Sequence, residues 1–473
     1  MFQEGGGVGL EDSTPTRSDP GGEPERRLPL SFLVSGRPTR APSRLAVVAW
    51  LAIAVCLAAG AVVASTAAGD RLWHKPTFTG FDEQAHFDYV VHLSHGDVPG
   101  WGQLYAPDTV HILDCVGLNR TVAQPCVTTA GPRRYPPAGY SYEAQQPPLA
   151  YVAYVPFLRP GAAPAAQLES VRRGGVVWLA LAAILLVALA WLSDLTVPQM
   201  VLLQSACILN PMAIQAAGTV TNDSPGLAAG AASMVAALLL RRRRPAVAVP
   251  AALAVGAVLG LMKAFFLIAP LALLVGALLL ERPRDVRSSP RAFLRRNATE
   301  LCMVLGATIS TVAFLLYQNH RATVAPSVVL RALLGGQTTH LPRWSTLELS
   351  VEHAFTAFQA YVPTSVLPLF AIWGVLVYGS AAGLLLNRST SRARALRALA
   401  GGTLIAAVAL DVGFPLLDYL QGHFNYYAPS RYLLPLVPIL AYVVARALRP
   451  AALVVVGVVL PALAVGSLLF API

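Results

Sequence analysis

Long apolar runs recur along most of this chain, and they constrain its fold more than any other feature. Runs of roughly 18 or more apolar residues are typical of helices that cross a lipid bilayer. Of the 473 residues, 55% are hydrophobic and only 12% are charged. This composition excludes an ordinary soluble globular fold. The sequence predicts an all-α polytopic membrane protein.

The apolar runs predict about eleven transmembrane helices. Residues 1–43 are rich in Gly, Pro, Ser, Glu and Arg and lack apolar periodicity, so we expect a disordered cytoplasmic tail before a membrane domain at 44–470. Residues 69–170 are mixed polar sequence and predict a large, partly helical outer loop between the first two spans. The expected spans are about 44–68, 174–193, 197–217, 223–240, 246–261, 264–280, 298–317, 354–386, 398–417, 431–447 and 451–470.

The net charge of +11 comes mainly from arginine clusters in the loops between these spans. Cytoplasmic loops carry an excess of Lys and Arg, so the clusters indicate topology rather than a nucleic-acid partner. With a cytoplasmic N-terminus, the arginine-rich loops 241–244, 281–296, 387–397 and 446–449 all fall inside. Together with the Ala- and Arg-rich composition, this predicts a multi-pass protein of a bacterial inner membrane with its polar site on the outer face.

Two of the five cysteines, Cys115 and Cys126, share the long polar loop. They could form a disulfide if that loop faces an oxidising compartment, and they could equally remain free thiols. No Cys/His spacing typical of zinc is present.

The segment from Phe81 to Phe87 places two carboxylates and a histidine just after the first span. If residues 82–95 form a helix, Asp82, His86 and Tyr89 lie on one stripe. A carboxylate there could accept a proton from an attacking hydroxyl. Alternatively, Asp82 and Glu83 simply stabilise the first turn of a helix.

A second polar segment, at residues 142–151, holds Glu143 and Gln146 directly before a double proline. Pro147 and Pro148 stop a preceding helix and favour an extended backbone before them, which orients both polar side chains from a rigid corner. The alternative is an interfacial loop with tyrosines at the membrane boundary.

Three basic residues lie at the outer ends of predicted spans: Arg172, Lys263 and Arg431. Each could bind a phosphate, or could extend to water as a snorkelling side chain. In an outer turn, Asn222 and Asp223 could contact substrate or could cap the following helix.

These segments, in this order, resemble the GT-C glycosyltransferases. Within that superfamily the chain is most similar to a family of bacterial integral membrane proteins with Pro-Asp-Glu-Pro-Ala-His-Phe-like and His-Gln-Pro-Pro-Leu-like segments. The similarity covers roughly residues 45–450 and includes Thr221–Ser224, Gly260–Lys263 and Arg431–Pro435. The chain departs from the pattern at Phe81 and Gln84, where the family has proline, and at Gln146, where related transferases have Lys or His.

The resemblance implies that Asp82 is the catalytic carboxylate with Glu83 beside it, and that Glu143 and Gln146 lie near the sugar or its phosphate. The expected donor is a polyprenyl-phosphate sugar, and the expected acceptor is a glycan, lipid or protein of the cell envelope. Asp82 would act as the base with inversion at the anomeric carbon, while the basic residues and His86 would bind substrate. No cofactor is required, although the carboxylates leave room for a divalent cation. The alternative is a transporter or flippase of lipid-linked glycans.

Overall fold

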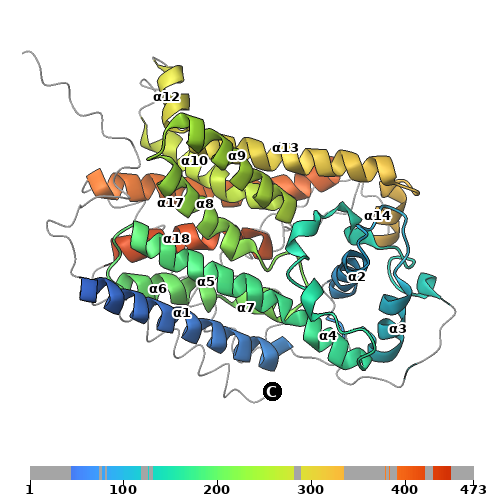
Figure 1. Cartoon of the computed structure of the whole chain (residues 1–473). Coiled ribbons are helices and arrows are strands. Elements are labelled where there is room, and N and C mark those ends of the chain that lie inside the picture. Colours follow the sequence, from blue (N-terminus) through green and yellow to red (C-terminus); the bar gives the residue numbers. More distant parts are fainter. Residues whose placement is uncertain are drawn as a thin grey trace, which may run out of the picture.

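Figure 1 shows the computed structural model of the chain, which describes residues 44–73, 77–79, 82–118, 126, 131–281, 289–334, 379, 383, 391–420 and 430–448. This part of the chain consists of α-helices and short 3₁₀ helices, with two isolated β-bridges. The all-α prediction is therefore confirmed over the described residues. The predicted tail at 1–43 and the predicted span at 451–470 lie outside them, as does the predicted span at 354–386 apart from residues 379 and 383.

The apolar helices form a bundle of roughly aligned rods (Figure 1). Five helical segments are long and apolar enough to cross a membrane, and a sixth is obtained if the α6–α7 pair, bent by 56°, counts as one. Helix α8 and the segment Ala264–Leu280 are shorter apolar helices. The described residues thus account for five or six of the eleven predicted spans by length and composition. The bundle helices are α1 (Arg44–Trp73), α5 (Gly174–Leu192), α6 (Val197–Ile208), α7 (Pro211–Gly218), α8 (Gly226–Leu240), α9 (Pro245–Met262), α10 (Ile268–Leu280), α13 (Ala298–Arg321), α17 (Ser391–Leu420) and α18 (Val437–Ala447).

Small residues allow the bundle helices to pack closely. Helix α9 packs along α13, and α10 packs along α17. A Cβ atom added at Gly256 of α9 would overlap the backbone carbonyl of Met303 in α13, and one at Gly306 would overlap Leu253 in the same way. Such close approach of backbones is typical of helix pairs in membranes. Large apolar side chains such as Ile184 and Ile309 remain exposed on the bundle surface, as contact with lipid requires.

The described residues between 77 and 172 form a separate layer at one end of the bundle, which we call the cap (Figure 1). It has its own hydrophobic core, with Phe87, Tyr105, Ile112 and Leu168 among its buried side chains. The segment between the first two predicted spans is thus partly helical, whereas its placement as an outer loop of GT-C type stays a prediction. The cap comprises α2 (Glu83–Ser94), α3 (Pro107–Val116), η2 (Pro132–Arg134), η3 (Tyr142–Gln145), η4 (Pro148–Ala150), η5 (Val155–Phe157) and α4 (Pro164–Arg172).

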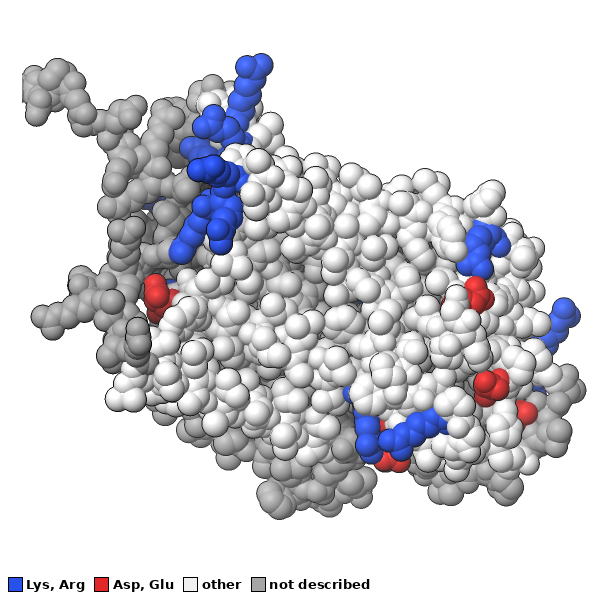
Figure 2. Space-filling model, in the orientation of Figure 1, with Lys and Arg blue, Asp and Glu red and all other residues white. Residues whose placement is uncertain are grey.

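Basic side chains gather at the end of the bundle opposite the cap, near α12 (Pro290–Arg296), as Figure 2 shows. These basic side chains include the exposed Arg242, Arg243, Arg244, Arg291 and Arg295. At the capped end, basic and acidic side chains are interspersed instead (Figure 2). The two ends of the bundle therefore differ in charge as the loop sequences predict.

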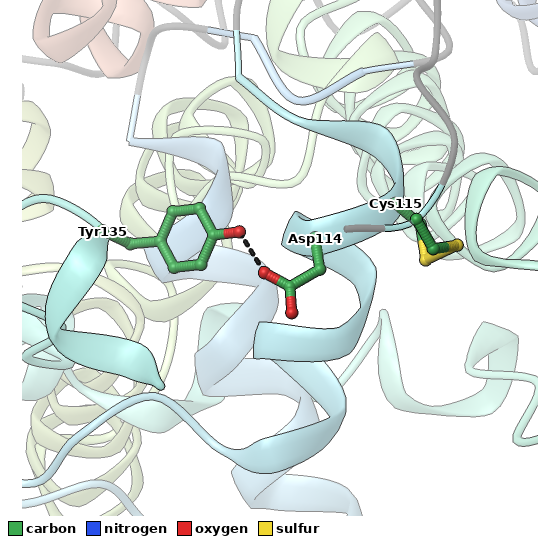
Figure 3. Close-up of a disulfide and its surroundings, with 4 residues drawn as sticks. Asp114, Cys115 and Tyr135 are labelled. Atoms are coloured by element: carbon green, nitrogen blue, oxygen red, sulfur yellow. Dashed lines mark hydrogen bonds between the residues drawn. A yellow bond between two sulfur atoms is a disulfide. The ribbon is translucent and has the colours of Figure 1, made fainter. Parts of the chain in front are cut away.

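A disulfide joins Cys115, the penultimate residue of α3, to Cys126 in the cap (Figure 3). Beside it, the Tyr135 hydroxyl donates a hydrogen bond to the Asp114 carboxylate (Figure 3). Of the two alternatives left open by the sequence, the structure contains the disulfide.

Candidate active site

Glu83 is fully buried in a bidentate ion pair with Arg172. The Arg172 Nε and Nη2 atoms lie 2.8 Å from the two carboxylate oxygens. The same oxygens accept backbone N–H bonds from Thr79 at 2.8 Å and from Val220 at 3.0 Å. Burial alone would raise the pKa of Glu83, but the charge and hydrogen bonds of Arg172 hold it below its ordinary value. These contacts tie α2, α4 and the turn after α7 together.

Asp82 precedes α2 and differs from Glu83 in almost every respect. Its side chain is 39% exposed, and its backbone adopts a left-handed conformation with φ 61° and ψ 8°. The Tyr142 hydroxyl donates a hydrogen bond of 2.6 Å to Oδ1. The other oxygen, Oδ2, lies 3.7 Å from the Arg431 guanidinium. A left-handed backbone is uncommon for a residue other than glycine, and such residues cluster at functional sites.

Asp223, Lys263 and Arg431 form a buried charge cluster next to Asp82. The Lys263 ammonium pairs with Asp223 and donates a 2.9 Å hydrogen bond to the Asn222 amide oxygen. The Arg431 Nε lies 2.8 Å from the other oxygen of Asp223. Burial would raise the pKa of Asp223, but the two cations lower it. Arg431 comes from η7 (Ser430–Leu436) and Lys263 precedes η6 (Ala264–Leu267), so three distant segments converge here.

The alternatives raised from sequence for these residues can now be compared with their contacts. Lys263 is only 2% exposed, so it does not extend to water. Helix α8 begins after Pro225 and has no side-chain cap, so Asn222 and Asp223 do not cap it. Both side chains instead contact Lys263.

Glu143 and His86 form the buried wall of the site on the cap side. Burial, followed by the charge of Asp82, raises the pKa of Glu143 to about 8. Its Oε2 lies 3.8 Å from the His86 Nδ1 and has no hydrogen-bond partner among the described residues. His86 Nδ1 also lies 2.8 Å from the Tyr151 hydroxyl. Burial lowers the pKa of His86 to about 3, so the imidazole is neutral at physiological pH.

The double proline has the local effect expected from the sequence. Helix η3 ends at Gln145, and Gln146 is extended with φ −88° and ψ 137° before Pro147. The Gln146 carbonyl accepts a 2.7 Å hydrogen bond from Tyr89, whose ring stacks on Tyr151 with 4.1 Å between centroids. These contacts hold the segment before the double proline against α2.

The structure brings most of the predicted residues to one place. Asp82, Glu143, His86, Asp223, Lys263 and Arg431 interact electrostatically or by direct contact, and Asn222 joins through Lys263. Arg172 lies apart from them in its pair with Glu83. The predicted catalytic role of Glu83 stays a prediction, but its contacts are those of a structural ion pair. The described residues include no group of three or more His, Cys, Asp or Glu side chains placed to hold a metal ion.

Two tyrosines that the sequence did not indicate as site residues also contact the site. Tyr142 is 2% exposed and donates to Asp82. Tyr432 lies beneath Lys263, whose ammonium is 4.2 Å from the ring centroid, a cation–π contact. The only sequence signal for either was its position next to Glu143 or Arg431.

Comparisons with protein-family models, with curated proteins and with solved structures found no match to this chain. The resemblance to GT-C enzymes therefore stays a prediction.

Proposed function

We propose that this protein is a membrane glycosyltransferase that moves a sugar from a polyprenyl-phosphate donor to an acceptor hydroxyl at the capped end of the bundle. The observation that carries the proposal is the half-exposed Asp82 carboxylate beside a buried pair of cations. Asp82 lies 3.7 Å from Arg431, which with Lys263 also pairs with Asp223. A base next to preorganised positive charge suits displacement of an anionic leaving group.

In the proposed reaction, Asp82 accepts the proton of an acceptor hydroxyl as its oxygen attacks the anomeric carbon. The new C–O bond forms while the bond from that carbon to the phosphate oxygen breaks, so the configuration inverts. The bonding electron pair leaves with the phosphate, which becomes a dianion. Arg431 and Lys263 would stabilise this charge, because guanidinium and ammonium groups bind phosphate oxygens strongly. The hydrogen bond that the Tyr142 hydroxyl donates holds the Asp82 carboxylate in place.

Two features support placing this site on the outer face of a bacterial inner membrane. Exposed arginines gather at the opposite end of the bundle, which matches the rule that basic loops stay in the cytoplasm (Figure 2). The Cys115–Cys126 disulfide lies in the cap, and disulfides persist in oxidising compartments.

The test is a transfer assay with a panel of polyprenyl-phosphate hexoses and pentoses as donors and a cell-envelope glycan fraction as acceptor, which measures the release of polyprenyl phosphate by the purified protein. We expect activity from the parent and at least a hundredfold loss in Asp82→Asn. Asp97→Asn is the matched control, because Asp97 is also about 40% exposed and also pairs with an arginine, Arg321. Full activity in Asp82→Asn, at an unchanged level of folded protein, would contradict the proposed base.

One observation favours a flippase of lipid-linked glycans as a second candidate. The α6–α7 pair is bent by 56° at its break, and broken helices are frequent at the binding sites of transporters. The distinguishing experiment uses proteoliposomes with a fluorescent polyprenyl-phosphate sugar. Movement of the label between leaflets with no released polyprenyl phosphate would favour the flippase.

A further inference from the structure

A cavity of about 510 Å³ lies at the junction of the bundle and the cap, separate from the candidate active site. Apolar residues of α5 and of the ends of α7 and η5 form most of its walls, and Arg172, Arg173 and Glu169 of the α4–α5 region form its polar side. Val177, on the wall, is 45% exposed. The cavity therefore opens onto the same face of α5 that exposes Ile184, about two helical turns further along the helix.

The polar side of the cavity carries both signs of charge. Arg173 and Glu169 are exposed by 61% and 47%, and their charged atoms are 3.8 Å apart. An exposed pair of this kind contributes little to stability and can separate to meet a ligand. Arg172 is committed to the buried Glu83 at 2.8 Å. The groups at the mouth are thus one cation and one anion a single helical turn apart.

We propose that this cavity binds a zwitterionic aminophospholipid from the surrounding bilayer. The phosphate pairs with Arg173, the ammonium of the headgroup pairs with Glu169, and an acyl chain lies against Val176, Val177 and Ala180. An anionic phospholipid fits less well, because it satisfies Arg173 but places negative charge beside Glu169. The bound lipid would fill the junction between α1, α5 and the cap.

Native mass spectrometry of the purified full-length protein, titrated with phosphatidylethanolamine or phosphatidylglycerol, tests this assignment. We expect the parent to bind phosphatidylethanolamine about threefold more tightly, which is the size of effect that a solvent-exposed ion pair gives. Glu169→Lys should reverse this preference. The exchanged pair Glu169→Arg with Arg173→Glu should restore it, because both headgroup charges again have a partner.

The cavity itself is tested by Val177→Trp, which fills it, with Ile184→Trp as the matched control on the same helix outside it. Loss of the bound lipid only in Val177→Trp supports the site. Equal binding of the two lipids by the parent, or unchanged phosphatidylethanolamine binding in Val177→Trp, overturns the proposal. If Val177→Trp does not fold, the charge-exchange series decides alone, since those side chains are exposed. Because no glycosyl donor is used, the result is independent of the proposed enzyme activity.

Discussion

Replacing Arg172 by methionine should destabilise the junction between cap and bundle by about 3–5 kcal/mol, the usual cost of leaving a buried charge without its partner. The structure explains this magnitude. Arg172 is 5% exposed and Glu83 is fully buried, and two side-chain hydrogen bonds of 2.8 Å are lost together. A third bond, to the Thr77 carbonyl at 2.9 Å, is lost with them.

A double-mutant cycle separates the pair from its surroundings. Glu83→Gln leaves a buried guanidinium and should also cost several kcal/mol, whereas Glu83→Gln with Arg172→Met removes both charges. The double variant should therefore cost less than the sum of the two single variants by at least about 2 kcal/mol. Equilibrium unfolding in mixed micelles measures each free energy, followed by fluorescence of Trp101 in the cap and of Trp178, an α5 residue that packs in the same hydrophobic cluster.

The pH dependence gives an independent check on the same pair. The folded-state pKa of Glu83 lies below its ordinary value of 4.5, so the stabilisation is present above that value and is lost as pH falls through the folded pKa. Arg172→Met should weaken this loss of stability in acid. Additive single variants and an unchanged acid profile would together refute the argument that this pair holds the junction.

Three further predictions concern the site and the bundle. Tyr142→Phe removes the donor to the Asp82 carboxylate and should lower turnover about tenfold, measured by polyprenyl-phosphate release. Burial raises the pKa of Glu143 to about 8, so the folded state binds more protons than the unfolded state. The stability of the parent should therefore fall as pH rises from about 4.5 to 8. Glu143→Gln should flatten that part of the unfolding profile, and an equally steep fall in this variant would contradict the assignment. Gly256→Ala overlaps a backbone carbonyl of α13 and should cost about 1–3 kcal/mol, whereas Gly60→Ala has open space and should not destabilise.

Local features of the site could be predicted from the sequence, because they depend on near neighbours. The helix after Asp82 and the extended residue before Pro147 are both present, although the Asp82 side chain makes no capping hydrogen bond to that helix. The partly helical cap followed from the absence of a long apolar run between residues 69 and 170. The predicted span count is not confirmed, because the described residues omit one predicted span and nearly all of another, and five or six of the described helical segments have spanning length.

Long-range pairings could not be predicted in the same way. Glu83 and Arg172 are 89 residues apart, and Lys263 reaches Asp223 across 40. A single sequence shows that each is a charged residue near an apolar span, but not which opposite charge it meets. For the same reason the adjacent carboxylates Asp82 and Glu83 look equivalent in the sequence, although the first is half-exposed and the second is fully buried.

The backbone at Asp82 decides which substitution is a clean test of its chemistry. Its φ of 61° is left-handed, a conformation that Asp and Asn tolerate but that costs other non-glycine residues about 1–2 kcal/mol. Asp82→Asn also retains an oxygen that can accept from Tyr142. We therefore expect Asp82→Ala to unfold at least about 1 kcal/mol more easily than Asp82→Asn in the same micelle titration, although both lack the base. Equal stability would show that the left-handed turn is not constrained, and the loss of activity in Asp82→Ala could then be attributed to the carboxylate alone.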